Sequence, residues 1–207
     1  MPKNTATINN KDSSKSEKRT AEIYRVAANL IKEKGYHATS MNDIAKRLKL
    51  TKAGLYYYID GKSDLLFSII QFGMKQLEDQ VVLPCRAIAD PEDRLRQIIE
   101  KHTVLILDLG GAISILTDEV QKLPLAQRRE IVAMKRGYMD LMRNTLRQLG
   151  VQKKMRQLNT NVTAMNVFAL ILGVARWYNP KKGWSSARVS REVSKFAMGA
   201  VLNDDDV

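Results

Sequence analysis

The stretch from residue 39 to residue 66 constrains the fold more than any other part of the chain; its sequence is TSMNDIAKRLKLTKAGLYYYIDGKSDLL. Ser40 and Asp43 have the spacing of a capping box, which predicts the start of a short helix. After a connection of only a few residues, Thr51 is a suitable N-cap for a second short helix that extends to about residue 58. Two short helices joined this tightly are typical of a helix-turn-helix.

The second helix of this pair has the composition of a surface that meets nucleic acid rather than that of a core helix. Its first residues are small or polar, so its N-terminal end is slim enough to enter a major groove. The three tyrosines at 56–58 point about 100° apart on a helix, so they cannot all be buried on one face. Lys52, and Lys62 before the next helix, are placed to meet phosphates. The alternative, an ordinary helical hairpin on the protein surface, does not explain why so many exposed aromatic and cationic residues cluster here.

The distribution of charge agrees with this interpretation. The chain carries a formal net charge of +12, and residues 1–62 hold 13 Lys and Arg against 6 Asp and Glu. The remaining 145 residues hold 21 against 16, so positive charge is denser at the N-terminal end, as expected of a phosphate-binding module. Binding to a membrane surface would need a large apolar face opposite the cations, and the first 16 residues have almost none.

Residues 17–66 resemble the DNA-binding domain of the TetR (tetracycline-repressor-like) family of transcriptional regulators. The residues that carry the resemblance are Ala28, Gly35, Tyr36, Thr39, Ile44, Ala45, Leu50, Lys52, Leu55, Tyr56, Tyr58, Lys62 and Leu65. One departure is Lys49, which stands in the turn where the family often has glycine and which would add a phosphate contact. The resemblance implies that these residues face DNA: Thr39, Ser40, Thr51, Lys52, Ala53, Gly54, Tyr56, Tyr57, Tyr58 and Lys62.

Apolar residues keep helical spacing through the rest of the chain, so we predict an all-α fold. A first helix ends at Gly35 and completes a three-helix DNA-binding domain. Further helices are expected at 63–82 (stopped by Pro84), from 90 to about 109, and at 112–122, 124–149, 160–178 and 186–201. The predicted domains are a disordered basic tail (1–16), a helix-turn-helix DNA-binding domain (17–62) and a ligand-binding and dimerisation domain (63–207).

The C-terminal helices carry the expected effector site. His102 lies on an apolar stripe, where a structural role is favoured over a ligand contact. Methionines on the 124–149 helix are more often core residues than pocket residues, though they suit a cavity that adapts to flexible ligands. The turn RWYNPKKGW at 176–184 gives a weaker resemblance to TetR regulators that respond to acyl-coenzyme A (acyl-CoA) thioesters. It implies that Arg176, Lys181 and Lys182 meet coenzyme A phosphates, although a turn that only caps two dimer helices is favoured. The candidate ligand residues are His102, Ile106, Leu109, Glu119, Met134, Tyr138, Met142, Phe168 and Arg176.

The last two helices are expected to form a homodimer. Residues 160–178 are apolar on nearly all sides, so this helix lies in the centre of the domain or is partly covered by a second subunit. The helix at 186–201 is amphipathic with small residues that allow close packing. Two such helices and their two-fold mates would form a four-helix bundle, where TetR-family proteins usually dimerise.

Other functional classes fit less well. The chain lacks the glycine motifs of nucleotide enzymes, the HExxH metal motif and the G-x-S-x-G nucleophile motif, so we expect neither an enzyme nor a cofactor. No run of about 20 apolar residues is present to cross a membrane, no secretion signal is seen, and a single cysteine, Cys85, suits the cytoplasm. We expect a repressor released from a palindromic operator by a small apolar or acyl-CoA effector. The alternatives are a drug-efflux regulator that binds a xenobiotic, or a helical protein-binding adaptor.

Overall fold

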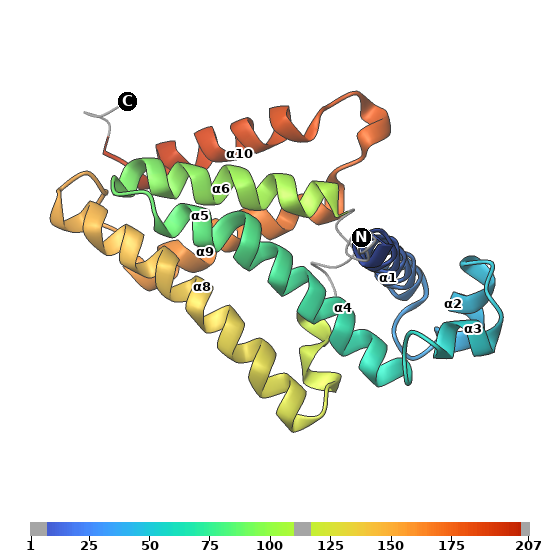
Figure 1. Ribbon diagram of the computed structural model, residues 1–207. Helices are drawn as coiled ribbons and strands as arrows, with labels where there is room; N and C mark the ends of the chain where they lie inside the picture. Colours follow the sequence, from blue (N-terminus) through green and yellow to red (C-terminus); the bar gives the residue numbers. More distant parts are fainter. Residues whose placement is uncertain (1–7, 110–116, 204–207) are drawn as a thin grey trace, which may run out of the picture.

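The computed structural model describes residues 8–109 and 117–203, and within these ranges the chain is helical without any strand (Figure 1). This confirms the predicted all-α class. No helix of the described residues is long and apolar enough to cross a membrane. The helical elements are α1 Ile8–Lys34, α2 Met41–Arg47, α3 Lys52–Tyr56, α4 Lys62–Leu77, η1 Glu78–Val82, α5 Leu83–Arg86, α6 Pro91–Asp108, η2 Thr117–Lys122, α8 Leu125–Val151, α9 Thr160–Trp177, η3 Pro180–Lys182 and α10 Ser186–Val201.

The first three helices form a small unit at one end of the molecule (Figure 1). Ile23, Ala27 and Leu30 of α1 are fully buried and pack with buried residues of α2 and α3. Gly35 ends α1 with a left-handed φ of 85°, the conformation that favours glycine at this position. The helix begins at Ile8, inside the segment predicted to be disordered. A helix already formed by its packed part can extend at little further cost, because nucleation is the unfavourable step.

The predicted linking helix continues beyond the residue expected to stop it. Five π-helical residues, Glu78–Val82, join α4 to α5, and Pro84 lies in the first turn of α5 instead of ending the helix. A proline is tolerated there because its missing N–H falls where an intrahelical bond is not required. The prediction that Pro84 stops the helix is therefore wrong.

α6 is the central helix of the C-terminal part and contacts α8, α9 and α10. It starts as predicted, with Asp90 as N-cap and Pro91 in the first turn. The buried Arg94 donates from Nε to the carbonyl of Ile88 at 2.8 Å and from Nη1 to Gln148 Oε1 at 2.6 Å. Buried charges are tolerated only when hydrogen-bonded in this way, so Arg94 fixes the start of α6 against α8.

α9 is less buried within one chain than its apolar sequence predicts. One face packs on α6 and α8 through residues such as Val167 and Ile171, whereas Val162 and Met165 are more than half exposed. On α10, the aromatic ring of Phe196 is 70% exposed. Of the two situations predicted for α9, the structure agrees with partial cover by a second subunit rather than full burial inside the domain.

Candidate functional site

The turn between α2 and α3 is built by local hydrogen bonds. Ser40 Oγ accepts from the Asp43 N–H at 3.1 Å and the Ser40 N–H donates to Asp43 Oδ2 at 3.0 Å, which completes the predicted capping box. The Ser40 hydroxyl also donates to Asp43 Oδ2 at 2.6 Å, and this bond, together with the one from the Ser40 N–H, lowers the pKa of Asp43. At the other end of α2, Lys49 adopts the left-handed conformation with φ 56°, and the Leu50 N–H donates to the carbonyl of Ala45. This is a Schellman motif with lysine at the position that usually holds glycine.

α3 has an exposed polar side and a second side that packs on the core through one buried residue, Leu55. Thr51 caps it, since its Oγ1 accepts from the Gly54 N–H at 2.9 Å. Leu55 is fully buried, while Tyr57 is 84% exposed, an exposure that packing cannot explain for so large an aromatic ring. Tyr58 is half-buried against the core. The expectation that one tyrosine supports the core and the others point outward is confirmed.

The structure places most of the predicted DNA-facing residues on this surface. Ser40, Lys49, Thr51, Lys52, Ala53, Tyr56 and Tyr57 are exposed, and Gly54 and Tyr58 are half-exposed. Thr39 is an exception, because its side chain is buried and its hydroxyl donates to the carbonyl of Gly35 at 2.9 Å. Thr39 therefore serves the packing of α1 against α2.

Lys62 has partners inside the protein. Its Nζ donates to the carbonyl of His37 at 3.1 Å and lies 4.5 Å from the centre of the Tyr36 ring. Lys122 of η2 lies 5.5 Å from the same ring. Burial raises the pKa of Tyr36, so its hydroxyl stays neutral beside these lysines. Tyr36 thus joins the α1–α2 loop to the C-terminal part.

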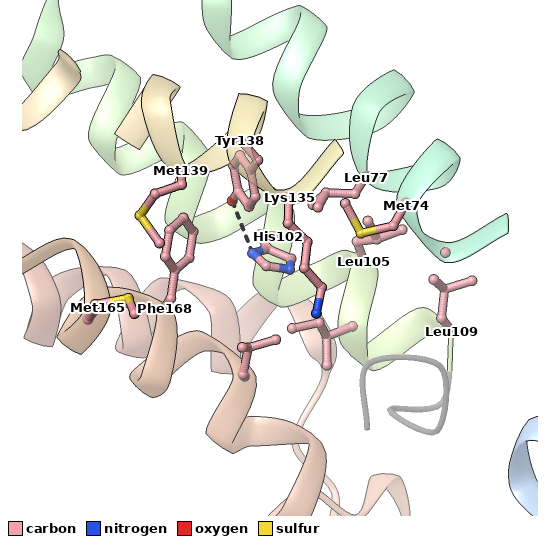
Figure 2. Close-up of a pocket in the computed structure, with 13 residues that line it drawn as sticks. Met74, Leu77, His102, Leu105, Leu109, Lys135, Tyr138, Met139, Met165 and Phe168 are labelled. Carbon is pink, nitrogen blue, oxygen red and sulfur yellow. Dashed lines mark hydrogen bonds between the residues drawn. The ribbon is translucent and has the colours of Figure 1, made fainter. Parts of the chain in front are cut away.

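A cavity of about 320 Å³ opens between α4, α6, α8 and α9 (Figure 2). This volume is at the lower end of the range for small-molecule sites. Most of its wall is apolar, and all four helices contribute to it. The residues that line it are Gly73, Met74, Leu77, His102, Leu105, Ile106, Leu109, Lys135, Tyr138, Met139, Met165, Phe168 and Leu172.

His102 and Tyr138 form the polar pair in this wall. Tyr138 Oη lies 3.0 Å from His102 Nδ1, and both side chains are buried. Burial lowers the pKa of His102 to about 3 and raises that of Tyr138 well above its usual value, so both groups are neutral. Among the described residues the Tyr138 hydroxyl contacts no other acceptor, so we infer that it donates to Nδ1 and that Nε2 carries the imidazole proton. That second nitrogen lies on the ring edge turned away from Tyr138 (Figure 2).

Five of the nine predicted ligand residues line the cavity: His102, Ile106, Leu109, Tyr138 and Phe168. The other four do not. Met142 is fully buried in the core, Met134 packs partly against the core, Glu119 pairs with Lys122, and Arg176 is exposed on α9. The apolar stripes of single helices predicted residues that face the core, but they do not say where neighbouring helices leave a space.

The cavity residues missed from sequence come from all four helices, and those on α6 and α9 are Leu105, Met165 and Leu172. Lys135 and Met139 flank Tyr138 on α8, at positions that a stripe centred on buried residues leaves out. Gly73, Met74 and Leu77 belong to α4, which was interpreted only as a link to the DNA-binding unit. For α4, the one available signal was Gly73, because a glycine within an otherwise apolar helix often has a packing or functional reason.

Two family models match the chain. One is described as "Tetracyclin repressor-like, C-terminal domain" and matches residues 89–201, and the other is described as "Bacterial regulatory proteins, tetR family" and matches residues 23–69. The chain belongs to the TetR family. It is therefore a ligand-responsive DNA-binding transcriptional regulator and not an enzyme, as expected from residues 17–66.

Relatives of the chain include one regulator of fatty acid metabolism and one transcriptional activator. The chain is 25% identical over 131 residues to the fatty acid metabolism regulator protein of Bacillus subtilis (strain 168), an alignment that covers 63% of this chain and 67% of that protein. It is 29% identical over 84 residues to the transcriptional activator FasR of Mycolicibacterium smegmatis, covering 41% of this chain and 38% of that protein.

Solved TetR structures match nearly over their full length. The chain is 29% identical to AibR in complex with isovaleryl coenzyme A and operator DNA, with a TM-score of 0.75, covering 89% of this chain and 98% of that one. Another match is the TetR-family regulator PfmR from Thermus thermophilus, 25% identical with a TM-score of 0.75, covering 86% of this chain and 97% of that one.

Proposed function

We propose that this TetR regulator is a homodimeric repressor that leaves a palindromic operator when an acyl-CoA thioester binds the cavity between α4, α6, α8 and α9. The observation that carries the proposal is the contribution of α4 to the cavity wall, because α4 starts at Lys62, directly after the helix-turn-helix. An effector in this cavity touches the element that holds the DNA-binding unit. The functional parts are the DNA-binding unit at 17–62 and the effector and dimer part at 63–207.

The DNA contacts fall on the exposed side of α3. Thr51, Lys52 and Ala53 form its exposed N-terminal end, the end that enters a major groove in helix-turn-helix proteins. Tyr57 extends from the same short helix and supplies a ring and a hydroxyl to the sugar-phosphate backbone. Lys49 adds a cation in the preceding turn. Because Thr39 is buried and Lys62 is bonded to His37, they position this surface rather than touch DNA.

The second subunit covers the exposed apolar side of α9 and α10. A groove of about 590 Å³ runs along these helices and is lined by residues that include Val162, Leu170 and Phe196. Exposed apolar surface of this kind marks an interface, and a two-fold arrangement would let the same face meet itself. Two DNA-binding units would then reach successive major grooves about one helical turn apart.

The effector is an acyl thioester with a short acyl group. The apolar wall receives the acyl chain. Tyr138 holds the His102 imidazole in one tautomer, so that His102 Nε2–H is a neutral donor for the thioester carbonyl. The volume of about 320 Å³ suits a small group. The similarity to AibR, whose solved complex contains isovaleryl coenzyme A, and to a fatty acid metabolism regulator supports the same class of ligand. The protein acts in the cytoplasm, where such thioesters and the operator are both available.

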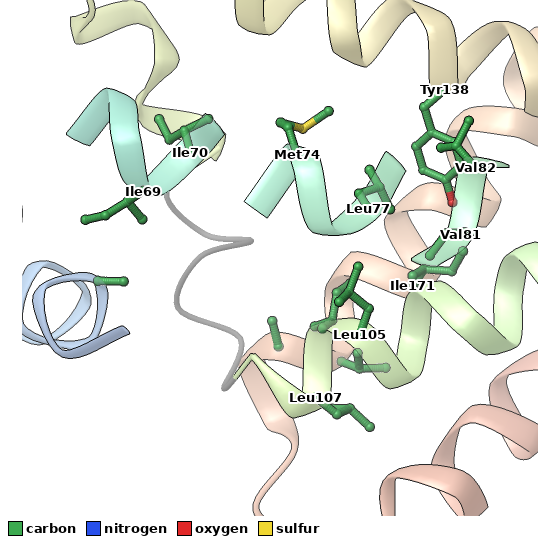
Figure 3. Close-up of a cluster of buried hydrophobic side chains, with 14 of the residues drawn as sticks. Ile69, Ile70, Met74, Leu77, Val81, Val82, Leu105, Leu107, Tyr138 and Ile171 are labelled. Carbon is green, nitrogen blue, oxygen red and sulfur yellow. The ribbon is translucent and has the colours of Figure 1, made fainter. Parts of the chain in front are cut away.

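The coupling between cavity and DNA passes through α4. Met74 and Leu77 line the cavity and also belong to the buried cluster that holds α4 against α6 through Leu105 (Figure 3). The π-helical turn at 78–82 follows directly, and such turns are frequent at functional sites. Displacement of Met74 and Leu77 by a ligand changes the tilt of α4, and with it the spacing of the two DNA-binding units. By linkage, operator DNA must weaken effector binding by the same factor.

The test uses a duplex selected by the protein from a random library. We expect isovaleryl-CoA or octanoyl-CoA to release the duplex, measured by fluorescence anisotropy, and to bind the free protein in calorimetry. Met139→Trp places an indole in the cavity, and this variant should bind the duplex normally but ignore the thioesters. Thioester binding without any change in duplex affinity would contradict the proposed regulation. Release by hydrophobic drugs but not by thioesters would favour a xenobiotic effector.

A further inference from the structure

A second concave surface lies beside the effector cavity and is rich in arginine. It has a volume of about 320 Å³ and is lined by Gln121 of η2 and by Arg128, Arg129, Val132, Ala133 and Arg136 of α8. Arg128 Nη1 donates to Gln121 Oε1 at 3.0 Å, which holds one guanidinium at the groove. Within residues 8–109 and 117–203, none of the three arginines forms an ion pair with a carboxylate.

The charge of this part of α8 is unbalanced. Between Lys122 and Met139 the sequence has three arginines and Lys135 but a single carboxylate, Glu130. Glu130 accepts from Gln71 Nε2 of α4 at 2.6 Å, so its carboxylate is turned to α4. Three guanidinium groups around one groove, without an internal counterion, match the geometry of phosphate, which arginine binds with two parallel hydrogen bonds.

The groove and the cavity follow one another along α8. Arg128 and Val132 line the groove, and Lys135 and Met139 line the cavity, so these four residues form one stripe at the i, i+4, i+7, i+11 spacing of a helix face. The rise per residue of an α-helix puts Arg128 about 16 Å from Met139 along the axis. One molecule can occupy both places if it has an apolar group, a flexible neutral arm of about this length and a phosphorylated end.

We infer that the arginine groove of η2 and α8 binds the phosphates of the acyl-CoA effector, while its acyl group occupies the neighbouring cavity. This inference rests on the proposed function and assigns a binding place to the phosphorylated part of the ligand, which the cavity does not hold. The thioester lies near His102, the pantetheine arm extends along α8 past Lys135, and the pyrophosphate and 3′-phosphate reach the arginines. Arg176 lies on α9, and Lys181 and Lys182 lie on η3 before α10, so none of the three lines this groove of η2 and α8.

The decisive experiment compares two ligands with the same acyl group. Isovaleryl-CoA carries the phosphates, whereas isovaleryl-pantetheine has the same thioester and arm without them. We expect the exposed pair Arg129→Ala/Arg136→Ala to raise the Kd for isovaleryl-CoA at least tenfold in calorimetry and to leave the Kd for isovaleryl-pantetheine unchanged. The matched control is Lys181→Ala/Lys182→Ala, which removes two exposed cations elsewhere and should change neither affinity.

Any other result would overturn the inference, and each result would point to a different cause. An equal loss of affinity for both ligands would mean that the arginines act on the cavity and not on phosphate. Unchanged affinity for isovaleryl-CoA, or a loss in the Lys181/Lys182 variant instead, would place the phosphates elsewhere while leaving the proposed function intact. A loss of duplex affinity in the ligand-free Arg129/Arg136 variant would assign the groove to DNA phosphates. If the wild-type protein binds neither thioester, the proposed function fails together with the inference.

Discussion

The DNA-binding unit and the effector cavity use tyrosine in opposite ways. Tyr57, which follows α3, is 84% exposed and its ring packs in a T-shaped arrangement with Tyr58, whereas Tyr138 on α8 is buried and hydrogen-bonded to His102. The DNA-binding surface exposes its polar and aromatic groups to solvent, whereas the effector cavity holds the buried His102–Tyr138 pair, together with Lys135, in a mostly apolar wall. The comparison teaches that the DNA-binding surface depends on which side chains a short segment exposes, while the effector site depends on how four separate helices meet.

The strongest test of this contrast lies within α3 itself. Leu55 of α3 is fully buried and Tyr57, the C-cap of α3, is exposed two residues later, so neighbouring positions hold one stabilising and one recognition residue. Leu55→Ala should lower the free energy of unfolding by about 2–5 kcal/mol, as core truncations do. Tyr57→Ala should change it by less than about 0.5 kcal/mol. Thermal and urea unfolding would measure both, and a large loss in Tyr57→Ala would refute its assignment as a recognition residue.

The next effect concerns DNA affinity. Tyr57→Ala and Lys52→Ala should each weaken operator binding by about 10–100-fold, which corresponds to about 1–3 kcal/mol. Ser40→Ala removes the cap of α2 and should also lower stability by about 1 kcal/mol. Anisotropy titrations at two salt concentrations would separate the variants, because only Lys52→Ala should also reduce the salt dependence. Unaltered operator affinity in both α3 variants would show that another surface binds DNA.

The sequence predicted these local features because their causes are local. The Ser40–Asp43 box, the Thr51 cap and the Asp90 cap each depend on residues within three positions of one another. The cavity does not: Gly73, His102, Lys135 and Phe168 lie at least 29 positions apart and meet only after the helices pack. The burial of Thr39 was likewise missed, because its acceptor, the carbonyl of Gly35, becomes available only where α1 ends.

The cavity predicts a dependence of stability on pH. The pKa of His102 is lowered to about 3 by burial, below its value of about 6.5 in the unfolded chain. Below pH 6.5 the unfolded chain therefore binds a proton that the folded protein excludes, and stability falls by up to about 1.4 kcal/mol per pH unit until pH 3. His102→Gln should remove this component between pH 6.5 and 5, measured as the difference from wild type in urea unfolding. Equal slopes in the two proteins would show that His102 is not held neutral.

The smallest expected effects come from two lysines in the same backbone conformation. Lys49 after α2 and Lys153 after α8 have φ values of 56° and 59°, and each follows a helix that ends in the same pair of hydrogen bonds. Replacement of either by glycine relieves an unfavourable left-handed conformation, partly offset by the greater entropy of glycine in the unfolded chain. Both variants should therefore gain about 0.5–1 kcal/mol of stability.

Their effects on DNA should differ, because only Lys49 lies beside α3. Lys49→Gly should weaken operator binding a few-fold and reduce the slope of log K against log salt by about 1, while Lys153→Gly should leave both unchanged. Lys49→Ala removes the charge but keeps the strained backbone, so it should show the loss of affinity without the gain in stability. If Lys153→Gly lowered the salt slope as well, the cations would act on DNA through the net charge of the protein rather than through a contact at the turn.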